Sequence, residues 1–64
     1  DDTLYTVMKL PMKYKEVVYL YYYEGYNSTQ ISKILKKPES TIRNHLSEAR
    51  KKLKKILGGD LNEK

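Results

Sequence analysis

The polar side chains between Ser40 and Lys51 recur at the spacing of one helical face. They follow one another at steps of four, three and four residues: Ser40, Asn44, Ser47 and Lys51. The positions flanking them carry mostly charge, on Arg43, Glu48, Lys54 and Lys55. Hydrogen-bonding groups therefore come first, and positive charge follows. In a helix that enters a DNA groove, N-terminal side chains reach base edges and later ones contact phosphates. The order of residues thus favours DNA binding.

An apolar stripe on the opposite side indicates how this helix packs. The stripe consists of Ile42, Leu46, Ala49, Leu53 and Ile56. At about 100° per residue these positions fall on a narrow arc, as in an amphipathic helix. We therefore expect a helix over residues 39–57, which Gly58-Gly59 ends.

A shorter helix is predicted just before it. Asn27 and Gln30 have the spacing of a capping box, in which each side chain satisfies a backbone amide at the helix start. The helix should cover residues 28–35, with an apolar face made of Ile31, Ile34 and Leu35. Pro38 suits the first turn of the following helix. Two helices joined by Lys36-Lys37-Pro38 have the outline of a helix-turn-helix.

Two further helices are predicted upstream, over residues 2–9 and 11–24. Leu10-Pro11 separates them, because proline disfavours the helical conformation in the residue before it. Gly25 suits the left-handed position that follows a helix. The inward face of the second helix is expected to contain Tyr14, Val17, Val18 and Tyr21, with Leu20 at its edge.

The elements predict an all-α fold, a compact four-helix domain. Its 64 residues allow one small core, because a domain of this size buries only about 60% of the surface of its unfolded chain. We assign residues 1–57 to the domain and residues 58–64 to a flexible polar tail. The first residue is not Met, so we expect the chain to be a piece of a longer protein.

Composition argues against catalysis, metals and membranes. The chain has no cysteine and one histidine, so we expect no metal and no cofactor. No convergent acid-base pair is evident, so we expect neither an enzyme nor a small-molecule substrate. No apolar run approaches the roughly 20 residues that span a bilayer, and no secretory signal is evident, so we expect no membrane partner and a cytoplasmic location.

The net charge of +5 is concentrated in one part of the chain. Residues 1–35 hold four basic and four acidic groups, whereas residues 36–57 hold eight basic groups against Glu39 and Glu48. A polyanion would therefore approach one face of the domain first.

A cluster of tyrosines allows two interpretations, a surface for stacking on bases or a source of core and protein-contact side chains. Its members are Tyr19, Tyr21, Tyr22, Tyr23 and Tyr26. Stacking on unpaired bases is disfavoured, because side chains around a whole helix circumference cannot form one platform. We expect some of the tyrosines to fill the core, since the chain lacks Phe and Trp. Outward ones, such as Tyr19 and Tyr22, would form a patch for a protein partner.

From about Leu10 to Leu53 the chain resembles region 4, the C-terminal promoter-binding domain of bacterial sigma factors, and most closely that of the extracytoplasmic-function group. The resemblance rests on the order and spacing of linked segments. They are Leu10-Pro11, Glu24-Gly25-Tyr26, Gln30-Ile31-Ser32, Pro38, Thr41-Ile42-Arg43-Asn44-His45-Leu46 and Ala49-Arg50-Lys51-Lys52-Leu53.

The resemblance implies a domain that binds double-stranded promoter DNA at the −35 element, while another face contacts core RNA polymerase or an anti-sigma factor. It implies that Arg43 and Asn44 meet bases or nearby phosphates, that Thr41 meets a phosphate, and that Ser28 and Thr29 contact the backbone across the groove. The complete set of predicted DNA contacts is Ser28, Thr29, Ser40, Thr41, Arg43, Asn44, Ser47, Glu48, Lys51, Lys54 and Lys55.

Some residues depart from the family pattern. Those that leave the fold intact are Gln30, Ser32, Lys36 and Ser40, which stand where glutamate, alanine, glycine and glycine are frequent. His45 and Glu48 stand where arginine is frequent, which weakens the phosphate contacts that the resemblance implies. For His45 we expect packing or a phosphate contact, and for Glu48 an ion pair with Lys52 competes with base reading.

Other functions stay open at this point. Each lysine taken alone is as consistent with a solvated surface as with a phosphate contact. The helix-turn-helix would also suit the output domain of a response regulator or a transcriptional activator. The basic helix would also suit a protein-interaction module that binds an acidic partner.

Overall fold

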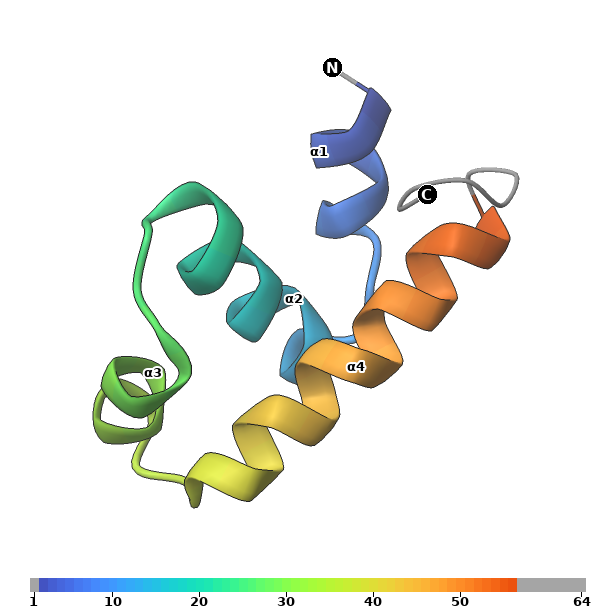
Figure 1. Cartoon of the computed structure of the whole chain (residues 1–64). Coiled ribbons are helices and arrows are strands. Elements are labelled where there is room, and N and C mark those ends of the chain that lie inside the picture. The colour runs from blue at the N-terminus through green and yellow to red at the C-terminus, as the bar shows by residue number, and fades with distance from the viewer. Residues whose placement is uncertain (1, 57–64) are drawn as a thin grey trace.

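The computed structural model describes residues 2–56, and their side chains from Leu4 onward. All regular elements of the described part are helices, which confirms the all-α prediction (Figure 1). Its elements are α1 (Asp2–Met8), α2 (Met12–Val18), the π-helix η1 (Tyr19–Tyr23), α3 (Ser28–Leu35) and α4 (Glu39–Ile56). The predicted helix stop at Gly58-Gly59 and the predicted tail over residues 58–64 lie outside the described residues.

Helix α4 is the longest element, and its apolar stripe forms much of the core. Four of the five predicted stripe positions are buried: Ile42, Leu46, Ala49 and Leu53. They pack against residues of the other helices, namely Val7, Leu10, Val17, Val18 and Ile31. The prediction for Ile56 was wrong, because its side chain is 61% exposed. The C-terminal end of α4 extends beyond α2, which packs along its middle (Figure 1).

The predicted second helix is not one continuous α-helix. Residues Met12–Val18 are α-helical, and a π-helical turn follows, in which the Glu24 amide donates to the Tyr19 carbonyl at 3.1 Å. This bond spans five residues and makes a wider turn than an α-helix. The wider turn changes which side chains face inward, so Leu20 packs against the core while Tyr21 is 39% exposed. The prediction that Tyr21 belongs to the inward face was therefore wrong.

The expectation that tyrosines of the cluster fill the core was also wrong. All five members are exposed, and the tyrosine that does pack against the core is Tyr14, in α2. The expected exposure of Tyr19 and Tyr22 is confirmed. Aliphatic side chains fill the centre of the domain, which leaves the aromatic rings on the surface.

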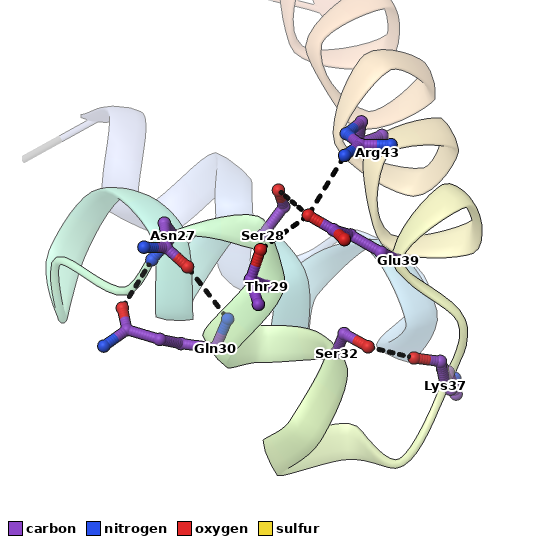
Figure 2. A network of polar contacts seen from close by, with 8 residues as sticks. All are labelled: Asn27, Ser28, Thr29, Gln30, Ser32, Lys37, Glu39 and Arg43. Atoms are coloured by element: carbon purple, nitrogen blue, oxygen red, sulfur yellow. Dashed lines mark hydrogen bonds and ion pairs between the residues drawn. The ribbon is translucent and has the colours of Figure 1, made fainter.

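The start of α3 has the predicted capping box. The Gln30 amide donates to the Asn27 side chain at 2.9 Å, and the Asn27 amide donates to the Gln30 side chain at 2.9 Å (Figure 2). Gly25 just upstream has φ +81°, as predicted for a residue that follows a helix. Ile31 is buried and Leu35 is half-buried, but Ile34 is 47% exposed, contrary to prediction. Helix α3, two turns long, contacts α4 and η1. The part of its surface that these two elements cover is too narrow to include Ile34.

The turn between α3 and α4 is held by its own hydrogen bonds. Lys36 ends α3 in the left-handed conformation, with φ 57° and ψ 46°. The Lys37 amide donates to the Ser32 carbonyl at 3.0 Å, and the Ser32 hydroxyl donates to the Lys37 carbonyl at 2.6 Å (Figure 2). An ion pair of 3.4 Å joins Lys37 to Glu16 in α2. Backbone and side chain together fix the angle at which α4 leaves the turn.

Candidate nucleic-acid interface

All eleven predicted contact residues have side chains that reach the surface. The exposed ones are Thr29, Ser40, Arg43, Asn44, Lys51, Lys54 and Lys55. The half-buried ones are Ser28, Thr41, Ser47 and Glu48. No member of the predicted set is lost to the core, so the fold leaves all of them available to a ligand.

The structure brings three of the predicted residues together around Glu39, which was not among the predicted contacts. The Glu39 carboxylate, in the first turn of α4, accepts from the Thr29 hydroxyl at 2.6 Å and from the Ser28 hydroxyl at 3.3 Å. The same carboxylate oxygen pairs with the Arg43 guanidinium at 3.0 Å. We call Ser28, Thr29, Glu39 and Arg43 the Glu39 network (Figure 2).

The Glu39 network links the first turn of α3 to the first two turns of α4. Thr29 contributes most to lowering the pKa of the Glu39 carboxyl; desolvation acts in the opposite sense, and Arg43 and Ser28 lower the pKa further. The carboxylate is therefore ionised at neutral pH. Its side chain remains 35% exposed, so solvent screens the ion pair and the network is only a modest contributor to stability.

Glu39 was missed because its partners in α3 lie ten and eleven residues upstream. The local signal was its spacing of four residues from Arg43, which brings opposite charges together on a helix. That spacing predicts the ion pair, but it gives no indication of the hydroxyl partners. Only the turn between the helices brings Ser28 and Thr29 to the carboxylate.

Glu48 makes a different ion pair from the one considered. It lies 3.7 Å from Lys51, three residues along the helix, whereas the predicted partner was Lys52. The Lys52 ammonium instead lies over the ring of Tyr14, 5.4 Å from its centroid. Lys51 is exposed and Glu48 is only half-buried, so solvent screens the pair and it contributes little to stability.

His45 packs as expected. Its ring meets the ring of Tyr14 edge-on, with centroids 5.7 Å apart, and its Nδ1 atom is buried without a hydrogen-bond partner in the described structure. The described residues contain no group of three or more His, Cys, Asp or Glu side chains that could hold a metal. The His45 ring thus packs at the junction of α2 and α4, and the expected phosphate contact stays a prediction.

The second half of α4 carries the densest positive charge. Its basic residues are exposed: Arg50, Lys51, Lys52, Lys54 and Lys55. At about 1.5 Å per residue, Lys54 and Lys55 lie roughly 23 Å along the helix axis from Glu39. Within the described residues, neither of these two lysines takes part in an ion pair. The structure thus separates a polar region at the start of α4 from a cationic region at its end.

Four of the exposed tyrosines lie in η1, an element that carries none of the predicted DNA contacts. Tyr19 and Tyr23 stack at 5.7 Å, and Tyr21 meets Tyr22 edge-on at 4.9 Å, all within η1. The Arg50 guanidinium donates to the Tyr22 hydroxyl at 3.0 Å, which connects this surface to α4. An apolar depression beside Tyr19 is lined in part by Met8 and Met12. Among the described helices, none is long and apolar enough to cross a membrane.

Comparison with known proteins agrees with this arrangement. The family described as Sigma-70, region 4 matches residues 3–53, which include α3, the turn and most of α4. The transcriptional repressor PagR of Bacillus anthracis is 44% identical over 55 residues, or 86% of this chain. The chain spans about half of that relative, 56% of its length. No solved structure matches the chain. The matches point to a DNA-binding regulatory domain of transcription and not to an enzyme. The chain belongs to the sigma-70 region 4 family.

Proposed function

We propose that the domain binds duplex DNA in a sequence-specific manner, with α4 in the major groove and the start of α3 across the neighbouring backbone. The observation that carries this proposal is the Glu39 network. It joins Ser28 and Thr29, predicted to contact the backbone, to Arg43, predicted to contact bases, on a single exposed surface. A recognition helix preceded by a helix that crosses the backbone is the geometry of a helix-turn-helix on DNA.

In this pose the predicted residues divide into two groups. Arg43 and Asn44 are exposed in the second turn of α4 and are the candidates for base contacts, since arginine pairs with guanine and asparagine with adenine in the major groove. Ser47 and Glu48 lie one turn further along. The remaining residues are assigned to phosphates: Ser28, Thr29, Ser40, Thr41, Lys51, Lys54 and Lys55.

The proposed target is the upstream −35 promoter element, recognised as region 4 of an alternative sigma factor of the extracytoplasmic-function group. Membership of the sigma-70 region 4 family supports this target. The tyrosine surface of η1 then serves core RNA polymerase or an anti-sigma factor, because exposed aromatic clusters suit protein partners. Residues 1–57 would act as one DNA-binding unit in the cytoplasm, with residues 58–64 as a tail.

A second candidate is a repressor that binds DNA without recruiting polymerase. The observation that favours it is the similarity to PagR, a transcriptional repressor that is 44% identical to this chain over 86% of the chain's length. Transcription assays with core RNA polymerase distinguish the two, using the full-length protein that carries this domain. A sigma factor would support initiation from a −35-dependent promoter, whereas a repressor would reduce initiation by another sigma factor.

Binding to labelled promoter fragments tests the DNA-contact proposal. We expect Arg43→Ala and Asn44→Ala each to weaken binding to the preferred sequence by about 1–3 kcal/mol and to relax base preference at one position. Lys54→Ala should weaken binding to all duplexes alike and reduce the salt dependence. If Arg43→Ala and Asn44→Ala left both affinity and base preference unchanged, the assignment of the recognition face would be wrong.

A further inference from the structure

The Glu39 carboxylate already binds the hydroxyl groups and the guanidinium group that the proposed function assigns to DNA contacts. Its carboxylate lies 2.6 Å from the Thr29 hydroxyl and 3.0 Å from the Arg43 guanidinium, so it occupies the place at which a phosphate oxygen would meet these donors. Phosphate and carboxylate share this chemistry, since both are anionic oxygen acceptors for hydroxyl and guanidinium donors. A phosphate that approaches the start of α3 therefore meets a carboxylate that already holds these groups.

We propose that Glu39 is an internal competitor of DNA phosphate, which holds Arg43 and the α3 hydroxyls in the free domain and thereby attenuates its affinity for duplex DNA. The inference rests on the proposed function, because it assumes that DNA meets the face formed by α3 and α4. Glu39 acts on DNA binding through Arg43 and the α3 hydroxyls that it holds. It is therefore a positioning residue and makes no attractive contact with DNA itself.

The competition acts on Arg43 differently in a complex with an unrelated duplex and in a complex with the preferred sequence. On an unrelated duplex, Arg43 gains only a screened phosphate contact by leaving Glu39, so it stays in the ion pair and neutralises no phosphate. On the preferred sequence, a bidentate contact with a base is worth about 1–3 kcal/mol, more than a surface ion pair of about 0.2–1 kcal/mol. Arg43 therefore leaves Glu39 only where it gains a bidentate contact with a base.

A purely structural role for Glu39 predicts the opposite effect of its removal. If the carboxylate merely held α3 against α4 in the right pose for DNA, its neutralisation would loosen the pose and weaken binding. If it competes with phosphate, its neutralisation strengthens binding and increases the salt dependence. The sign of the change separates the two roles.

The test is the salt dependence of duplex binding by Glu39→Gln. Glutamine keeps an oxygen that accepts from Thr29 and Ser28 but loses the charge that holds Arg43. We expect binding to tighten about two- to fivefold, the equivalent of one exposed ion pair. On an unrelated duplex, the slope of log affinity against log salt should become steeper by about 0.9, because Arg43 then neutralises one more phosphate.

Glu24→Gln is the matched control, because it removes the same charge from an exposed residue outside the Glu39 network. It should leave the slope unchanged. The double variant Glu39→Gln, Arg43→Ala should lose most of the added slope, since the effect acts through Arg43. Circular dichroism verifies that each variant keeps the helical content of the wild type.

A second measurement uses the wild type alone. The side-chain resonance of the Arg43 guanidinium should shift on the preferred duplex and stay in place on an unrelated one. Equal shifts on both duplexes, or Glu39→Gln binding that is no tighter than that of Glu24→Gln, would overturn the role given to Glu39. A wild-type domain that binds no duplex would overturn the proposed function as well, so the two failures are distinguishable.

Discussion

Lys36 adopts a backbone conformation that suits glycine, and its replacement should stabilise the domain. It is the one non-glycine residue with positive φ among the described residues, at φ 57°. The left-handed conformation costs an L-residue about 1–2 kcal/mol, because Cβ approaches the following carbonyl oxygen. Glycine avoids this cost but gains about 0.5–1 kcal/mol of extra freedom in the unfolded chain. Lys36→Gly should therefore raise the free energy of unfolding by about 0.5–1 kcal/mol.

Thermal unfolding followed by circular dichroism measures this change. For a domain of 60–100 residues, 1 kcal/mol corresponds to about 4–8 °C in Tm, so we expect an increase of roughly 3–6 °C. Lys36→Ala is the matched control, since it removes the same charge but keeps Cβ and with it the strain; its Tm should stay close to that of the wild type. Lys33→Gly, within α3, should lower the stability by about 1 kcal/mol.

The comparison of the three variants can refute the reasoning. A Lys36→Gly variant no more stable than Lys36→Ala would show that the turn carries no strain at this position. A gain shared equally by both variants would point to relief of charge repulsion with Lys33 and Lys37 instead. DNA binding by Lys36→Gly should follow that of Lys36→Ala, because neither substitution touches the predicted contacts.

Two further predictions concern the junction between α3 and α4. Glu39 has a lowered pKa in the folded domain, so its ionised form contributes stability that is complete above the unfolded pKa and is lost as the pH falls through the lower, folded value. Tm should therefore fall below about pH 4.5 more steeply in the wild type than in Glu39→Gln, and equal slopes in acid would contradict the lowered pKa. Ile42, fully buried in α4, should lose about 0.5–1.5 kcal/mol of unfolding free energy on substitution by valine, as measured by urea titration. The equivalent change at exposed Ile34, Ile34→Val, should have little effect, and a comparable loss there would mean that the core extends to that side of α3.

The ends of α3 and the start of α4 were predictable because their signals are local. The Asn27 and Gln30 capping box lies within four residues, and Gly25 and Pro38 mark chain breaks by their own backbone preferences. The buried stripe of α4 was equally accessible, since a helical period fixes which side chains share an arc. Such features depend on the sequence within one or two turns.

The π-helical turn and the Glu39 network were not predictable in this way. An α-helical period applied through η1 turns Tyr21 inward, whereas one wider turn brings Leu20 to the core instead. Nothing in a run of tyrosines distinguishes the two periods, so the packing of Leu20 against the core decides between them. Likewise, Thr29 meets Glu39 only because the bonds of Lys37 and Ser32 set the angle between the two helices.

The turn and the network together determine what DNA binding must disturb. Because the turn is held by Ser32 and Lys37, away from Glu39, a ligand can displace Arg43 without changing the angle between α3 and α4. The hydroxyls of Ser28 and Thr29 can then stay on the carboxylate or turn to a phosphate, again without movement of the backbone. Binding would thus require rotation of side chains rather than rearrangement of helices. In this proposal the Glu39 network sets the affinity of the face, and the turn sets its shape.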